Sequence, residues 1–343
     1  MKHKKIFYFL SGAAILIIII MIIIYTNLFG INITSNNINQ VIYIPTGSSY
    51  EQVLDTLESK FVIKNKKVLN WVARKKNYPA LIKPGRYIIG NNLSYVSLIN
   101  LLRSGKQVPV KITFSNVSTL NQIAGKIGKQ IEADSSLIIS FFSDNSNFAG
   151  DGFKKENIIS LFIPNTYEVY WNTDAKEVYT RLLKEYRIFW NDQRLSKAKE
   201  KGLDTKEVST LASIIDDEAS RSDEKPRIAG VYLNRLRMGI PLQADPTVKF
   251  ALNDNSITRI LKKDLLVDSP YNTYIHSGLP PGPIGCATID GIDAVLNSEK
   301  HDYIYFAARA DFSGYHNFSR TLSEHIRYAS LYQKELDKRK IFK

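Results

Sequence analysis

The chain has 343 residues, of which 44% are hydrophobic and 23% charged, with a formal net charge of +13 and a single cysteine, Cys286. This composition is typical of a globular protein of about two domains and excludes global disorder. One cysteine excludes an internal disulfide, and we expect Cys286 to act as a small apolar residue. The positive charge fits nucleic acid, an anionic membrane surface or an acidic polymer as a partner.

The N-terminus carries an almost unbroken apolar run over residues 6–25. We predict a cytoplasmic tail over residues 1–5 and a transmembrane helix over residues 6–26. A signal peptide is the alternative, but the run is long for one and no small-X-small cleavage site ends it. Three lysines precede the run, so the positive-inside rule places the rest of the chain outside the cytoplasm. We therefore expect attachment to the inner (cytoplasmic) membrane through one helix, an extracytoplasmic main part, and no nucleic-acid partner.

Residues 27–40 are rich in Asn, Ser and Thr and are predicted to be a linker. Residues 41–108 show a strand, two helices and a strand, with serines placed to cap helices. This βααβ order resembles a LysM-like module, which in LysM proteins binds amino-sugar polymer; a spacer role is the alternative. The predicted elements are a strand over residues 41–45, helices over 50–60 and 65–75, a strand over 85–89 and a further helix over 95–103.

Residues 109–343 mix short helices, strands and loops rich in Pro and Gly. Alternating apolar residues predict a strand over 110–114, and helical segments are expected near 120–131 and 175–201. Repeats and phosphate-binding glycine loops are not visible. The fold class expected for this chain is α+β, with an N-terminal transmembrane helix, a small LysM-like module and a mixed α+β catalytic domain.

One helix, over residues 205–219, carries the most informative carboxylate. Asp204 is placed as its N-cap with Glu207 three positions on, and an apolar stripe at helical spacing follows. Glu218 extends this core-facing stripe. Because burial disfavours the charged form of a carboxyl, we expect a raised pKa for Glu218 and a role as general acid. The alternative is an ion pair on a solvated last turn, with Arg221 or Arg227.

Several segments resemble the YceG-like family and follow the family's order along the chain. They are IYIPTGSSYEQVLDTL, KPGRYII, SLFIPNTYEVYW, LASIIDDEAS, GVYLNRLRMGIPLQADPTV, SPYNTY, GLPPGPI, YIYF and HNFSRTLSEH. The family consists of membrane-bound endolytic murein (peptidoglycan) transglycosylases, and the resemblance covers nearly the whole chain. Two positions depart from it. Asp216 replaces the first glutamate of the Glu-X-Glu pattern, and Asn165 replaces the aspartate of Phe-Pro-Asp-Thr-Tyr.

The resemblance implies a YceG-like catalytic domain over residues 109–343 that cleaves peptidoglycan glycan strands. The bond is the β-1,4 link from N-acetylmuramic acid to N-acetylglucosamine, and cleavage leaves a 1,6-anhydromuramic end. The position of Glu218 matches the catalytic acid. Because the substrate's own C6 hydroxyl attacks, one carboxyl suffices. Cell-wall synthases, the penicillin-binding proteins, are implied as partners in ending strand growth.

Sugar-binding clefts combine planar polar groups with aromatic faces, and the segments after Glu218 contain both. Local structural roles are the alternatives, since an asparagine or aspartate near a proline often only stabilises a turn. Residues 280–283, Pro-Pro-Gly-Pro, are expected to form a rigid wall. The predicted substrate-binding residues are Asn234, Arg235, Gln243, Asp245, Tyr271, Asn272, Tyr274 and His316, with Phe250 as a further aromatic.

We expect neither a metal nor a cofactor. The five histidines form no HExxH motif, and the sequence has no Gly-X-Ser-X-Gly elbow for a serine nucleophile. Two other functions remain open at this point. One is a muramidase that admits water and uses Asp216, Asp217 or Asp245 as a second carboxylate. The other is a non-catalytic cell-wall-binding scaffold, favoured by the LysM-like part and by the departure at Asp216.

Overall fold

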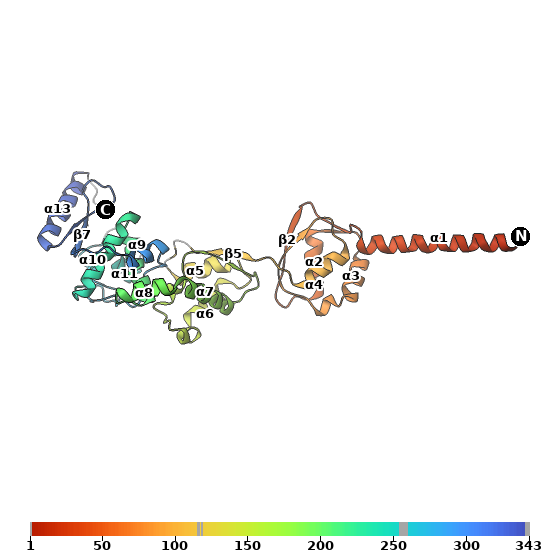
Figure 1. Ribbon diagram of the computed structural model, residues 1–343, viewed down its shortest axis with the longest axis horizontal. Helices are drawn as coiled ribbons and strands as arrows, with labels where there is room; N and C mark the ends of the chain where they lie inside the picture. The colour runs from red at the N-terminus through yellow and green to blue at the C-terminus, as the bar shows by residue number, and fades with distance from the viewer. Residues whose placement is uncertain (1, 115–116, 118, 254–259, 340–343) are drawn as a thin grey trace. The chain divides into compact units, whose positions relative to one another are not determined.

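The structure, a computed structural model, describes residues 2–114, 117, 119–253 and 260–339 (Figure 1). Its fold is mixed α+β and begins with a long apolar helix, which confirms the α+β part of the prediction. The chain divides into two compact units. Unit 1 comprises Met1–Lys111, Gln130–Ala133 and Glu168–Asp174, and unit 2 comprises Ile112–Lys129, Asp134–Tyr167 and Ala175–Lys343.

Helix α1 (Lys2–Phe29) is apolar on all sides, and its described side chains are largely exposed. In the described part of the chain, one stretch is long and apolar enough to span a membrane, Lys4–Phe29. An uncovered helix of this kind is stable in lipid rather than in water. Its length and composition fit a membrane anchor or a signal sequence.

Unit 1 is built around an antiparallel pair of strands, β2 (Asn39–Ile44) and β4 (Gly85–Gly90), with Asn39 opposite Gly90. Two helices lie between them in sequence, α2 (Tyr50–Lys60) and α3 (Lys66–Lys75), and α4 (Tyr95–Ser104) follows. The predicted order of strand, two helices and strand is therefore confirmed. The helices start where side chains accept from backbone N–H groups of the first turn, at Ser49, Asn65 and Ser94.

Residues 27–40, predicted to be a linker, are instead folded into unit 1. Helix α1 continues to Phe29, and β1 (Ile33–Thr34) pairs with β3 (Val62–Ile63). The side chain of Asn32 is buried and donates hydrogen bonds to backbone carbonyls at the end of α1. Polar composition suggests a loop but does not reveal such a cap, which satisfies carbonyls that a helix end leaves unpaired.

Unit 2 carries the helices from α5 on and the antiparallel strand pair β7 (Tyr305–Ala308) with β8 (His316–Ser319). Strand β5 (Val110–Thr113) pairs with β6 (Thr166–Val169), and the boundary between the two units runs through both strands. The predicted strand near 110–114 is confirmed, and the helical region near 175–201 consists of two helices. The helices are α5 (Leu120–Gly128), α6 (Ser135–Ser143), α7 (Ala175–Phe189), α8 (Asp192–Glu200), α9 (Thr205–Glu218), α10 (Lys225–Arg237), α11 (Asp245–Leu252), α12 (Ile289–Leu296) and α13 (Leu322–Lys338). Short 3₁₀ helices are also present. The first, η1 (Tyr78–Ala80), lies in unit 1, and the others, in unit 2, are Asn145–Asn147, Ala149–Asp151, Ile158–Leu161, Ser222–Glu224 and Asp264–Leu266.

Helix α9 contacts α8, α10, α11 and α12, and every residue from Val208 to Ile215 is buried. Its N-terminus has the predicted capping box, in which Asp204 and Glu207 satisfy each other's backbone N–H groups. The predicted helix over 205–219 is thus confirmed to within one residue. The body of α9 is enclosed between its partly exposed first turn and its last turn, and Glu218 lies in the last turn at a partly exposed position.

Candidate active site

Glu218 lies at the C-terminal end of α9 and faces α10. The hydroxyl of Tyr232 on α10 donates a hydrogen bond to Glu218 Oε1 at 3.1 Å. The two arginines that could have paired with Glu218 are engaged elsewhere: Arg221 donates to Ser313 O at 2.7 Å, and Arg227 to Glu299 at 2.8 Å. The ion-pair alternative is therefore wrong.

The electrostatic surroundings of Glu218 favour its neutral form. Burial is the largest cause that raises the pKa of Glu218 from 4.5 to about 7, and the nearby carboxylate of Asp245 is the second. The Tyr232 hydrogen bond and the positive charge of Lys249 oppose this rise. Burial also raises the pKa of Tyr232, so its phenol stays protonated and remains a donor. The predicted rise in the pKa of Glu218 is confirmed, and such a carboxyl can both give and take a proton near neutrality.

Asp245 and Tyr274 form one side of the group around Glu218. Tyr274 Oη donates to Asp245 Oδ1 at 2.6 Å. Burial, and then this hydrogen bond, raise the pKa of Tyr274, and the charge of Glu218 contributes as well. Asp245 is the first residue of α11 and is exposed, so a ligand can reach its free oxygen. The structure thus brings two predicted site residues together beside Glu218.

Arg235 holds Gln243 in place rather than facing solvent. Its guanidinium is buried, donates to the carbonyls of Pro241 and Ile304, and donates from Nη2 to Gln243 Oε1 at 2.6 Å. Gln243 is exposed and adopts a left-handed backbone with φ of 55°. Strained backbone of this kind often positions a functional side chain. Gln243 is therefore the accessible member of this pair.

Two predicted contact residues, Asn234 and Asn272, are enclosed and bonded to backbone. Asn234 Nδ2 donates to the carbonyls of His301 and Tyr303 at 2.8 and 2.9 Å. Asn272 has no exposed surface, and its amide donates to Leu265 O and Val267 O. For Asn272 this is the local structural role left open by the sequence, whereas Asn234 joins α10 to the distant segment before β7.

The remaining aromatic and histidine positions flank this group. Tyr271 packs on Phe250 of α11 with ring centroids 4.6 Å apart, and both rings are partly exposed. His316 Nδ1 lies 2.9 Å from Oε2 of Glu224, a carboxylate that also accepts from the His316 backbone N–H. Gly282, within residues 280–283, lies close to the backbone of Glu156, so a larger residue would not fit there.

The two positions that depart from the family pattern have structural partners. Asp216 Oδ1 accepts from Lys225 Nζ at 2.7 Å, and its carboxylate also accepts from the backbone N–H and hydroxyl of Thr288. It thereby joins α9 to the starts of α10 and α12. Asn165 is exposed, and its side-chain oxygen accepts from the backbone N–H of Thr166 at 2.7 Å.

Tyr232 is the functional candidate that the sequence did not single out. Tyr232 lies in the segment GVYLNRLR, which was quoted for its resemblance to the family. Its contact with Glu218, 14 residues away, depends on how α9 and α10 pack. The T-shaped contact with Phe306, at 5.7 Å between ring centroids, fixes its ring. No helical or strand spacing predicts this pairing.

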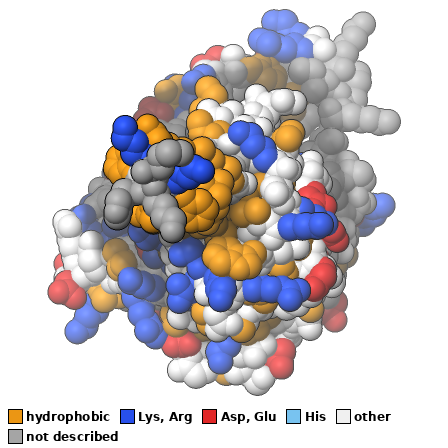
Figure 2. All heavy atoms as spheres, turned by 90° about the vertical axis from the view of Figure 1, so that its right-hand side faces the viewer, with side chains coloured by type: hydrophobic (Ala, Val, Ile, Leu, Met, Phe, Trp, Pro, Cys, Tyr) orange, Lys and Arg blue, Asp and Glu red, His pale blue; other side chains and the backbone are white. Residues whose placement is uncertain are grey.

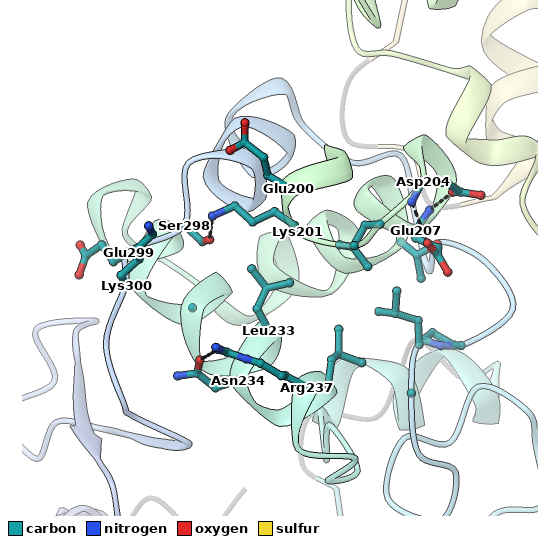
Figure 3. Close-up of a pocket in the computed structure, with 18 of the residues that line it drawn as sticks. Glu200, Lys201, Asp204, Glu207, Leu233, Asn234, Arg237, Ser298, Glu299 and Lys300 are labelled. Atoms are coloured by element: carbon teal, nitrogen blue, oxygen red, sulfur yellow. Dashed lines mark hydrogen bonds between the residues drawn. The ribbon is translucent and has the colours of Figure 1, made fainter. Parts of the chain in front are cut away.

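A large hollow in unit 2 lies on another face of α10 and does not include Glu218 (Figure 3). Its volume is about 1420 Å³, and Figure 3 shows Leu233 and Arg237 of α10 among its lining side chains, with Lys201, Glu207 and Lys300 around them. Basic and acidic residues are mixed along its wall. In the described part of the chain, no group of three or more His, Cys, Asp and Glu side chains is placed to hold a metal ion.

A partly buried acid with a raised pKa, flanked by aromatic rings and planar polar groups, is the kind of site that enzymes use to cleave glycosidic bonds. The model of the YceG-like family matches residues 42–330. The chain therefore belongs to the YceG-like family.

Among its relatives is the endolytic murein transglycosylase of Bacillus subtilis (strain 168), 30% identical over 308 residues, covering 85% of this chain and 83% of the relative. The endolytic murein transglycosylase of Streptococcus pneumoniae R6 is 29% identical over 300 residues, and the match spans 53% of its length. The crystal structure of a yceG-like protein from Listeria monocytogenes is also similar, with a TM-score of 0.55 and 28% identity. It covers 84% of this chain and 98% of that one.

Proposed function

We propose that this chain is an endolytic murein transglycosylase, a peptidoglycan lyase, and that Glu218 is its acid and base. The observation that carries the proposal is the protonated character of Glu218, with a pKa of about 7 and a tyrosine hydroxyl as its bonded partner. Membership of the YceG-like family and the names of the relatives support the substrate class.

The proposed reaction uses one carboxyl twice. Protonated Glu218 donates its proton to the oxygen that links C1 of N-acetylmuramic acid to N-acetylglucosamine, and the C1–O bond breaks. The resulting carboxylate then takes the proton of the C6 hydroxyl, whose oxygen bonds to C1. The products are a 1,6-anhydromuramic end and a free 4-hydroxyl, and Glu218 is protonated again. Tyr232 would keep the carboxyl oriented through both steps.

The accessible groups around Glu218 are assigned to the glycan. Gln243 and Asp245 would bind sugar hydroxyls, and Tyr271 and Tyr274 would cover the apolar faces of the rings. His316 would bind glycan at the edge of the site. Its ring contacts Phe306, and Phe306 in turn contacts Tyr232. The buried side chains of Asn234, Arg235 and Asn272 would maintain the shape of the site.

We also infer how the chain is attached and divided. Helix α1 would be a retained anchor, with residues 1–5 in the cytoplasm, residues 6–26 in the inner membrane and the rest outside. Residues 41–108 would be a LysM-like module, supported by their βααβ order, and residues 109–343 the catalytic part. Wall synthases would be its partners in ending strand growth.

Mass spectrometry of isolated glycan strands treated with the purified chain tests the proposed reaction. We expect new 1,6-anhydromuramic ends within strands, because the C6 hydroxyl replaces water as the nucleophile. Reducing muramic ends without anhydro product would reject the transglycosylase and favour the muramidase, for which Asp245 is the second carboxylate near Glu218. Wall binding without any new ends would favour the non-catalytic scaffold.

A further inference from the structure

The positive charge of the protein is concentrated in unit 1. From residue 30 on, unit 1 contains 12 Lys and Arg against six Asp and Glu, whereas the much longer unit 2 contains 31 against 27. Unit 2, which carries Glu218, is therefore closer to neutral for its size. A basic surplus concentrated in one small unit indicates a polyanionic partner for that unit rather than for the active site.

Unit 1 is joined to the end of α1 without a flexible segment. Asn32 Nδ2 donates to the carbonyls of Thr26, Asn27 and Gly30 at 3.3, 2.9 and 2.9 Å, and Leu28 packs against the unit 1 core. Asn32 is only seven positions beyond Tyr25, the end of the apolar run, at most a rise of roughly 10 Å in a helix. This is little more than one headgroup layer, which is about 5 to 8 Å thick. With α1 in a membrane, the face of unit 1 around α1 must meet the headgroups.

Helix α3 supplies that face with a stripe of basic and aromatic side chains. Lys67, Trp71 and Lys75 recur at every fourth position and are exposed, whereas α3 buries its opposite side against the unit 1 core. Trp71 is 52% exposed, and Lys75 Nζ lies 5.9 Å from its ring centroid. Lys64, just before α3, donates to Ile31 O at 2.6 Å, so the start of α3 lies at the end of α1.

The figures agree with this placement. Figure 1 draws α3 beside the end of α1, at the edge of unit 1 from which α1 projects. Figure 2 looks along α1 and shows mostly Lys and Arg among the charged side chains around the apolar helix, with hydrophobic side chains between them. Tryptophan is the residue preferred at membrane interfaces, and lysine extends its ammonium to phosphate.

We propose that the stripe of Lys67, Trp71 and Lys75 binds the headgroups of anionic phospholipids in the outer face of the membrane. The proposal rests on the membrane anchoring assigned to α1 under the proposed function. Trp71 inserts at the level of the headgroups, and the two lysines pair with lipid phosphates. Unit 1 is thereby held flat on the membrane surface instead of moving freely on a tether.

The test uses the full chain in vesicles of phosphatidylcholine, with and without phosphatidylglycerol, in which part of the lipid carries bromine as a quencher of tryptophan fluorescence. The chain has three tryptophans, so the contribution of Trp71 is isolated by comparing Trp71→Phe with the matched variant Trp171→Phe. We expect quenching in the anionic vesicles that disappears in Trp71→Phe and persists in Trp171→Phe. Raising the salt concentration should weaken it, because salt screens exposed charges.

A pair of charge-reversed variants tests the role of the lysines. Lys67→Glu with Lys75→Glu should abolish most of the quenching of Trp71. Lys83→Glu with Lys106→Glu changes the charge equally but lies near the start of β4 and the end of α4, away from Asn32, and should leave quenching intact. Equal quenching in both variants, or none in the wild-type chain, would overturn the proposal.

Two further outcomes separate this surface from the proposed function. A chain that alkaline washing removes from the vesicles would overturn both the anchor and this surface. A retained chain whose Trp71 is not quenched, and whose binding to isolated glycan falls in the Lys67 and Lys75 variant, would assign the stripe to glycan and overturn only this surface. Cleavage of isolated glycan in detergent does not depend on the stripe and continues to test the active site.

Discussion

Replacing Glu218 with Gln should reduce strand cleavage by about 10² to 10⁴-fold, the usual contribution of general acid–base catalysis. Glutamine has the same shape and still accepts the hydrogen bond from Tyr232, so the fold and the binding of glycan should persist. What is lost is the proton that Glu218 gives to the leaving oxygen. The measurement is the rate of appearance of anhydromuramic ends, with circular dichroism and glycan binding as checks of the fold.

Asp217→Asn is the matched control for this experiment. Asp217 is the neighbouring carboxylate, is exposed, and is only a minor cause of the raised pKa of Glu218. Its replacement should leave the cleavage rate within a few-fold of the wild-type rate. If Asp217→Asn silenced the enzyme while Glu218→Gln remained active, the assignment of the acid would be reversed.

Asp216→Ala should lower the free energy of unfolding by about 3 to 5 kcal/mol, the usual effect of removing one partner of a buried ion pair. The side chains of Asp216 and Lys225 are only 13% and 10% exposed, and Asp216 also accepts two hydrogen bonds from Thr288. The substitution would leave the Lys225 ammonium enclosed without its partner and would loosen the junction of α9, α10 and α12. Urea unfolding followed by circular dichroism measures the change.

Glu299→Ala provides the comparison for the ion pair. Glu299 pairs with Arg227 at 2.8 Å, but both side chains are 41% exposed, so we expect a loss of about 1 kcal/mol or less. The carboxylate of Asp216 faces Lys225 and Thr288 rather than Glu218, so folded Asp216→Ala protein should still cleave glycan. Unchanged stability together with lost cleavage would show that Asp216 acts in the chemistry, as one of the three second carboxylates considered for the muramidase.

The features that the sequence predicted best are those that depend on neighbouring residues. The capping box of Asp204 and Glu207 and the apolar stripe of α9 locate this helix to within one residue. The position of Glu218 on the buried stripe also predicts its raised pKa, because burial is the largest cause. Helix α2 begins and ends where its cap and periodicity indicate.

What the sequence did not predict depends on contacts between distant segments. The bond from Tyr232 to Glu218 and the pairing of Asp216 with Lys225 require the packing of α9 on α10. Asn234 was predicted to bind substrate because of its residue type, yet its amide donates hydrogen bonds to carbonyls 67 and 69 residues away. The same reason explains the linker prediction, because the backbone of Asn32 is bonded to Leu93 and Lys64, distant residues that composition does not place beside it.

The protonation of Glu218 links its pKa to the stability of the fold. Its pKa in the folded chain is about 7, above the ordinary value of 4.5, so the folded chain holds an additional proton between these pH values. This group's contribution to stability is therefore greatest at low pH and falls as the pH rises through that window. Glu218→Gln, which cannot ionise, should remove this part of the pH dependence.

A direct titration of the Glu218 carboxyl tests the central claim that one neutral acid performs the chemistry. Infrared difference spectra of the wild-type chain against Glu218→Gln isolate the carbonyl stretch of the protonated carboxyl, which can be followed from pH 4 to pH 9. We expect this band to persist at pH 6 and to disappear with a midpoint of about 7. A midpoint near the ordinary value of 4.5 would mean that Glu218 is already ionised at neutrality, and would contradict its role as the general acid.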